Sequence, residues 1–150
     1  MSKFFLSLLI LLTVSAAKAA DPLAGPIPAQ AVRAVDGDTL IVRAHIWLGQ
    51  DVETTVRLAG IDTPELKSRC GLEHDKALAA KAFLARLIEN PAVTLLEIRE
   101  DKYGGRIRAR VLTSTGADMS AELIKADLAR PYQGGQRQPW CGASEKEPQP

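Results

Sequence analysis

The sequence lacks a strong excess of charge of either sign. Its 150 residues hold 19 Lys and Arg against 18 Asp and Glu, which gives a formal net charge of +1. Proteins that hold nucleic acid by overall charge are strongly basic, so that class is excluded and any contact with a polyanion needs a local patch. One segment offers either such a patch or an ordinary solvated strand face: Arg99, Lys102, Arg106, Arg108 and Arg110.

Long hydrophobic runs are scarce, and residues 4–14 form the one long apolar stretch of the sequence. Lys3 precedes this stretch, and Ala17-Lys18-Ala19 follows it as a small-x-small cleavage pattern. The apolar core is too short to span a bilayer, so we predict a signal peptide over residues 1–19. The alternative is an uncleaved membrane anchor. After cleavage we expect an exported protein, periplasmic or secreted, without a stable membrane anchor; its 17 basic and 18 acidic residues give a net charge near −1.

Cysteine and histidine are also rare, with two residues of each. His45 and His74 have no ligand spacing, and two distant cysteines without a partnered histidine do not indicate a metal site. In an exported chain such a pair most simply forms one disulfide, here between Cys70 and Cys141. That bond would pin the C-terminal tail to the loop after Glu65, whereas two free thiols are the alternative.

Proline, glycine and hydrophobic periodicity divide the rest of the chain. Residues 20–30 contain three prolines and indicate an extended linker, and residues 133–150 form a tail without periodicity. Period-2 alternation predicts strands, and an approximate 3.6-residue period predicts helices. The predicted strands cover residues 31–35, 39–47, 52–61, 93–99 and 106–113, and the predicted helices cover residues 73–89 and 118–129. This order favours an α+β fold, a five-stranded OB-type β-barrel with two packed α-helices.

Two short runs carry the residues that indicate chemistry on phosphate. Asp38 lies in Asp-Gly-Asp-Thr, and Arg57 opens the run that contains Asp62 and Glu65. Carboxylates bind a hard cation, arginine holds phosphate oxygens, and an additional glutamate can accept a proton from water. Together they suggest metal-assisted cleavage of a phosphodiester. Taken alone, Asp38 is equally typical of a turn, and Arg57 of an exposed ion pair.

Over residues 31–132 the chain resembles the staphylococcal-nuclease-like (thermonuclease) domain family. Four motifs in order carry the resemblance: residues 36–39 (DGDT), 57–65 (RLAGIDTPE), 101–104 (DKYG) and 128–132 (LARPY). Each short motif is weak by itself, whereas their order and spacing are specific. The resemblance implies the OB-type barrel and a nuclease that acts on DNA and/or RNA with bound Ca²⁺.

The resemblance also implies a role for each matching residue. Asp38 and Asp62 match the calcium-binding aspartates, and the backbone carbonyl of Thr63 completes the protein ligands. Glu65 matches the glutamate that orients or deprotonates the attacking water, and Arg57 matches an arginine that holds the phosphate. We also predict that the substrate contacts Lys102, Tyr103 and Tyr132.

The chain differs from the family pattern at the second catalytic arginine. That arginine follows the Tyr-Gly of the third motif directly, whereas here Gly105 stands in that place and Arg106 comes one residue later. We predict that Gly105 is an insertion and that Arg106 takes the role, with Arg108 as the alternative, because a glycine-rich turn can absorb one residue.

These residues lead to an exported, calcium-dependent nuclease with little sequence specificity, expected to be a monomer. Two alternatives remain open: a non-catalytic module of nuclease ancestry that binds nucleic acid or another polyanion, and a cell-envelope assembly protein.

Overall fold

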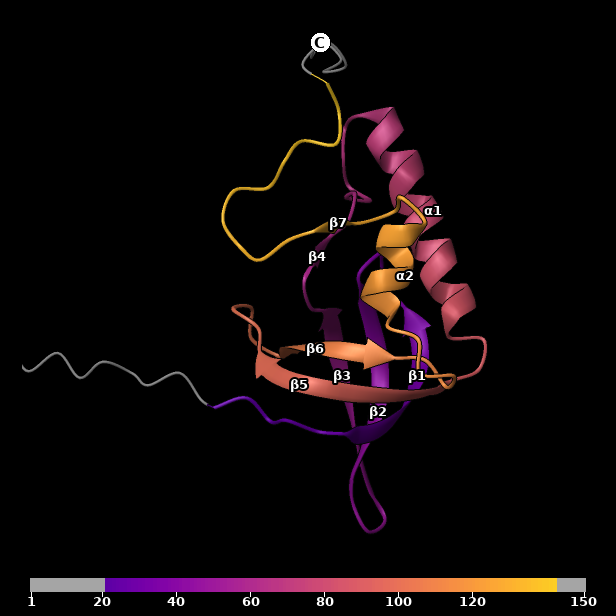
Figure 1. The fold of residues 1–150 in the computed structure, drawn as a ribbon, viewed down its shortest axis with the longest axis vertical. Coiled ribbons are helices and arrows are strands. Elements are labelled where there is room, and N and C mark those ends of the chain that lie inside the picture. Colours follow the sequence, from indigo (N-terminus) through magenta and orange to yellow (C-terminus); the bar gives the residue numbers. More distant parts are fainter. Residues whose placement is uncertain (1–20, 143–150) are drawn as a thin grey trace, which may run out of the picture.

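The computed structural model describes residues 21–142, so the predicted signal peptide lies outside the described residues. Figure 1 shows a β-barrel with two helices beside each other on one side of it. The strands are β1 (Ile27–Ala34), β2 (Thr39–Trp47), β3 (Gln50–Leu58), β4 (Ile61–Asp62), β5 (Ala92–Glu100), β6 (Arg106–Leu112) and β7 (Arg130–Pro131); the helices are α1 (Gly71–Leu87) and α2 (Met119–Lys125). No helix among these residues is long and apolar enough to cross a membrane.

Five strands close into a barrel in the order β1-β2-β3-β6-β5. All neighbouring strands are antiparallel except β3 and β6, which are parallel and place Arg57 opposite Arg108. This α+β architecture confirms the predicted five-stranded OB-type barrel with two helices. The parallel pair matters for the site, because it sets the outward-facing cations of β3 and β6 side by side.

The strand alternation that the sequence predicts is present in the barrel. Val56 and Leu58 of β3 are buried, as are Ala109 and Val111 of β6, while the arginines between them lie on the outer face. β2 spans the predicted residues 39–47. β1 begins at Ile27, inside the segment expected to be a linker, because small apolar side chains such as Ala29 pack into the barrel there.

Both helices differ from the predicted bounds. α1 begins at Gly71, two residues before the predicted start, and buries Ala77, Ala80 and Leu84. α2 is shorter than the predicted 118–129, because Asp127 adopts a left-handed φ of 57° and ends the helical path. Asp118 caps α2 as predicted.

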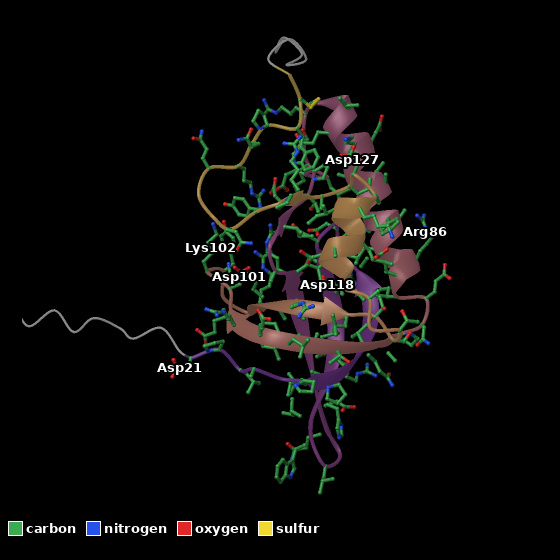
Figure 2. All side chains as sticks on the ribbon, viewed as in Figure 1. Asp21, Arg86, Asp101, Lys102, Asp118 and Asp127 are labelled. Atoms are coloured by element: carbon green, nitrogen blue, oxygen red, sulfur yellow. A yellow bond between two sulfur atoms is a disulfide. The ribbon has the colours of Figure 1, made fainter. Side chains whose placement is uncertain are left out.

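The end of the described chain returns to the loop before α1. β7 pairs with the two-residue strand β4, aligning Asp62 with Arg130. The predicted disulfide between Cys70 and Cys141 is present, and Figure 2 draws it as a yellow bond near the start of α1. Residues 133–142 are therefore fixed at both ends beside β4, the strand that contains Asp62.

Candidate active site

Asp38 lies in the short connection between β1 and β2 and is 3% exposed. The backbone N–H of Asp38 donates to Asp36 Oδ1 at 3.1 Å, an interaction typical of an Asx turn. Its carbonyl accepts a hydrogen bond from Leu58 N–H at 2.8 Å, which ties the turn to the end of β3. The carboxylate is thus held by local turn geometry and by the neighbouring strand.

Arg57 makes the central ion pair of the site. Its Nη1 lies 2.9 Å from Asp38 Oδ1 and 2.8 Å from Oδ2, and its side chain is only 15% exposed. The contact follows from the β2–β3 register, which places Thr39 opposite Arg57. Thr39 Oγ1–H also donates to Asp38 Oδ1 at 2.9 Å. One guanidinium edge is engaged with Asp38, on the outer face predicted for Arg57.

Close packing at Gly37 brings the second motif to the first. A Cβ at Gly37 would lie 2.8 Å from Ala80 Cβ and 3.2 Å from Thr63 Oγ1, so only glycine allows this approach. Thr63 lies close enough to Asp38 for its hydroxyl to favour the charged carboxylate and lower its pKa, a smaller effect than that of Arg57. Thr63 and Asp62 are 5% and 4% exposed, so the two predicted metal-binding segments meet in a buried layer.

Asp62 receives contacts from the C-terminal segment. Trp140 Nε1–H donates to Asp62 Oδ2 at 3.2 Å. Arg137 Nε lies 3.0 Å from Asp62 Oδ1, which is close enough for an ion pair. Among the described residues, however, that buried oxygen has no partner with hydrogen-bond geometry. Arg137 therefore neutralises the charge at Asp62 Oδ1 without forming a well-aligned hydrogen bond to it.

Glu65 lies at the open side of the site, with a side chain that is 60% exposed. Its carboxylate forms an ion pair with Arg137 through Oε1 and Nη1. Its backbone N–H donates to Glu73 Oε1 at 3.0 Å, and the other oxygen of Glu73 accepts from Ser68 Oγ–H at 2.6 Å. The first turn of α1 therefore orders the loop that contains Glu65 and leaves its carboxylate accessible to water.

A groove of about 1310 Å³ joins this carboxylate to the basic residues of the barrel. It runs past the β5–β6 turn, where Figure 2 labels Asp101 and Lys102. The predicted substrate-contacting and phosphate-binding side chains line this one groove together with Glu65: Arg57, Lys102, Tyr103, Arg106 and Tyr132. Predicted site residues from three of the four motifs, together with Arg106, are thus brought to one continuous surface, whose lining residues do not include Asp38 or Asp62.

Arg106 lines the groove, but its guanidinium is bound to a neighbour. Nε lies 2.5 Å from Asp101 Oδ2, and the guanidinium carbon lies 5.1 Å from the centroid of the Tyr103 ring. Lys102 Nζ lies 5.0 Å from the same ring. Within the described residues, the ion pair of Arg106 is with Asp101 and not with the buried aspartates. Arg108 lines the groove as well.

Burial gives Asp38 an unusual protonation equilibrium. Loss of hydration raises the pKa of Asp38 from 3.8 to about 6; the positive charge of Arg57 lowers it, and the negative charge of Asp36 raises it further. Arg57 therefore compensates only part of the cost of burying this carboxylate. A further cation near Asp38 would favour its charged form.

The oxygen donors present fit a hard cation. In the described part of the chain no cluster of three His, Cys, Asp or Glu side chains is arranged to hold a metal. The available donors are instead two buried carboxylates, Asp38 and Asp62, beside the backbone of Thr63. Asp62 Oδ1 is a buried oxygen that forms no hydrogen bond with any described residue, which leaves it suited to act as a metal ligand. Such a set leaves coordination positions for water and phosphate oxygen, which calcium accepts.

Three contributors to the site were missed by the sequence reasoning. Arg137 and Trp140 lie in the tail, where no periodicity marks them, and His74 has no spacing that indicates a role at the site. His74 Nδ1 contacts the carbonyl of Leu66 at 2.8 Å and helps to order the loop after Glu65. The predicted disulfide was the available signal for the tail, because it places residues near Cys141 beside the acidic motif.

A comparison with protein families matches residues 55–147 to the staphylococcal nuclease homologue family. The chain belongs to this family. Curated proteins gave no match. The matched span of this staphylococcal nuclease homologue includes Arg57, Asp62 and Glu65 and begins after Asp38. Asp38 is joined to the matched part by its ion pair with Arg57.

Proposed function

We propose that this staphylococcal nuclease homologue is an exported, calcium-dependent nuclease that hydrolyses phosphodiester bonds of DNA and/or RNA with little sequence specificity. The observation that carries the proposal is the buried Asp38–Arg57 ion pair, in which Arg57 lines a groove that Glu65 also lines. The turn that contains Asp38 packs at Gly37 against Thr63, the neighbour of the buried Asp62. Family membership supports nuclease ancestry, and the disulfide is in keeping with an oxidising, exported setting.

Asp38, Asp62 and the backbone carbonyl of Thr63 would hold the calcium ion. When bound, calcium supplies positive charge against the phosphate, where negative charge builds as water attacks. Asp38 and Asp62 are already fixed by their surroundings, so little reorganisation is needed to present their oxygens. Asp38 must be in its charged form to take part.

Arg57 and Glu65 would act on the reacting groups. Arg57, which lines the groove, would bind non-bridging phosphate oxygens and stabilise the charge of the transition state. Glu65 accepts a proton as water oxygen bonds to phosphorus and the phosphorus–oxygen bond to the leaving group breaks. Its exposure gives it access to that water.

The groove supports contact with a nucleic acid strand. Lys102, Tyr103 and Tyr132 offer a cation and two aromatic rings along it, and Arg106 and Arg108 add positive charge. Phosphate contacts and ring stacking do not depend on base identity, so little sequence specificity is expected. Arg106 would exchange its ion pair with Asp101 for a substrate phosphate.

The test compares cleavage of single-stranded DNA by the mature protein with Ca²⁺ and with a chelator. We expect calcium-dependent cleavage that falls about a hundredfold or more in Glu65→Gln, because the proton acceptor is lost. Glu53→Gln makes the same chemical change on the far hairpin, where Glu53 pairs with Arg43, and should retain activity. Absence of calcium-dependent cleavage, or full activity in Glu65→Gln, would contradict the proposal.

Two contacts favour a second candidate, a non-catalytic module that binds nucleic acid or another polyanion. Arg106 is bound to Asp101, and Arg137 is bound to Glu65, so two groups needed for turnover are engaged elsewhere. For this candidate, Glu65→Gln would bind a labelled oligonucleotide as the wild type does, and neither protein would cleave it at any pH. An envelope assembly role would be favoured if neither calcium nor oligonucleotide raised the melting temperature.

A further inference from the structure

The segment 133–142 is fastened on both sides of Arg137. Before it, the backbone N–H of Tyr132 donates to Gly60 at 2.8 Å, and its hydroxyl donates to the carbonyl of Gly135 at 2.7 Å. After it come Trp140 and the disulfide-bonded Cys141. In Figure 1 this segment forms the long loop that follows β7. The position of Arg137 is therefore set by anchors and not by its own contacts alone.

Trp140 is a second non-covalent anchor. Its ring lies 3.6 Å from the guanidinium carbon of Arg130 and 5.6 Å from Lys76 Nζ. Arg130 Nη1–H also donates to the carbonyl of Pro139 at 3.0 Å. Cation–π contacts of this kind stabilise most when they are shielded from water. They hold the chain three residues beyond Arg137 against β7.

These anchors direct the Arg137 guanidinium at the acidic site. Nε pairs with Asp62 and Nη1 with Glu65, so one side chain bridges the predicted metal ligand and the predicted base. Burial opposes the charged form of Arg137, but the hydrogen bond to Glu65 and the charges of Asp62, Glu65 and Asp38 outweigh it and raise its pKa. The guanidinium is thus a cation held within the field of three carboxylates.

A metal ion would need the same oxygens. Arg137 Nε lies 3.0 Å from Asp62 Oδ1, the buried oxygen that has no hydrogen bond among the described residues. Two cations that approach one carboxylate oxygen repel each other strongly where water is excluded. Occupation of Asp62 by a divalent cation therefore requires Arg137 to withdraw, and its withdrawal also frees Glu65.

We propose that Arg137 is a positioning residue that serves as an internal counter-ion and competes with a divalent cation for Asp62 and Glu65. It holds both carboxylates in place in the metal-free protein and lowers the affinity for the ion. The inference rests on the metal site of the proposed function. It adds a residue that neither the four motifs nor the family match assigns.

The test is calorimetric titration of Ca²⁺ alone into the metal-free wild type, Arg137→Gln and Arg43→Gln. Ca²⁺ and the Arg137 guanidinium compete for the same carboxylates, so removal of the guanidinium should strengthen Ca²⁺ binding. We expect Arg137→Gln to bind Ca²⁺ about tenfold more tightly than the wild type. Arg43→Gln removes one positive charge from the far hairpin and should stay within about twofold, since that exposed pair is screened by water. Circular dichroism confirms that each variant is folded.

Arg137→Lys gives a second measurement if Arg137→Gln does not fold. Lysine keeps the charge but loses the two-armed guanidinium, so its Ca²⁺ affinity should lie between those of the wild type and the glutamine variant. Equal or weaker Ca²⁺ binding in the variants, or no measurable binding in any of these proteins, overturns the inference. Tighter Ca²⁺ binding in Arg137→Gln, with no DNA cleavage by the wild type, would support the role of Arg137 and contradict the proposed nuclease function. DNA cleavage by the wild type, with unchanged Ca²⁺ affinity in the variants, would support the nuclease function and contradict the role of Arg137.

Discussion

At the scale of single residues, Asp38 combines deep burial with a raised pKa. Burial moves its pKa from 3.8 to about 6 despite the contact with Arg57. The folded protein therefore binds a proton at Asp38 more tightly than the unfolded chain does. The stability linked to this proton is fully present below pH 3.8 and is lost as the pH rises through about 6.

The variant Asp38→Asn, which removes the titrating carboxyl, gives the first prediction. Both proteins are compared in chelator, by subtracting the free energy of unfolding of Asp38→Asn from that of the wild type. This difference should fall as the pH rises from about 4 to about 7. The asparagine cannot ionise, so it does not lose this contribution. Urea denaturation at several pH values measures the difference, and Asp75→Asn on the exposed side of α1 is the matched control. A difference that does not change with pH would contradict the raised pKa.

The residues of the site divide into those that sequence can predict and those that it cannot. Asp38, Arg57, Asp62 and Glu65 lie in short motifs with fixed spacing. In the structure Arg57 and Glu65 line one groove, and Asp38 is joined to it by its ion pair with Arg57. Arg137 reaches the site through the disulfide, the Trp140 anchor and the hydrogen bonds of Tyr132, so its position depends on contacts across the whole chain. A local pattern contains no information of that kind.

At the scale of elements, α2 depends on its N-cap residue, Asp118. The side chain of Asp118 accepts hydrogen bonds from Ser120 N–H at 2.9 Å and Ala121 N–H at 3.3 Å. It also pairs with Arg110 Nε on β6 at 2.6 Å. Figure 2 places Asp118 at the start of α2, beside the barrel. The cap therefore fixes the helix end and ties it to a strand.

Asp118→Ala should destabilise the protein by about 1 kcal/mol, because two amide groups of the first turn lose their acceptor. The exposed pair with Arg110 adds little to this loss. For a domain of this size the melting temperature should fall by about 4 °C. Asp118→Asn is the matched control, because asparagine caps equally well and should recover most of the loss. Equal melting temperatures for the alanine variant and the wild type would contradict the cap.

The alternation of apolar and polar residues predicts where the barrel strands lie, but it does not predict which strands pair with each other. The alternation in β6 predicts which side chains are buried, and the structure agrees at Ala109 and Val111. The parallel pairing of β3 with β6 joins segments about 50 residues apart and is set by barrel closure. Helix ends were displaced for a similar reason, since backbone geometry at Asp127 depends on packing beyond the local sequence.

At the scale of the whole molecule, the disulfide closes a large loop. Cys70 and Cys141 are 71 residues apart, and the loop between them contains most of the second half of the fold. In the chain-entropy account, a cross-link of this span stabilises the folded state by about 4 kcal/mol, mainly by restricting the unfolded chain. The bond therefore acts on the whole domain as well as on the tail.

Replacement of both cysteines by alanine should lower the melting temperature by about 16 °C, in proportion to the lost entropy restriction. Thermal denaturation followed by circular dichroism measures the change. The wild type in reductant should melt close to the double variant, which serves as the control. A melting temperature within about 2 °C of the oxidised wild type would indicate that the bond contributes little to stability.

Closure of the barrel has a consequence for how a polymer can be held. Each of its five strands has a partner on both sides, so the closed part of the barrel offers no free row of backbone N–H and C=O groups to another chain. Residues 50–54 of β3 extend beyond the pairing with β6 and are paired with β2 alone. Addition of a strand from a peptide or a second copy is therefore blocked where the barrel is closed, which includes the segment of β3 that contains Arg57. A polymer must therefore be bound there by side chains on the outer face of the barrel, and the identity of those side chains determines what is recognised.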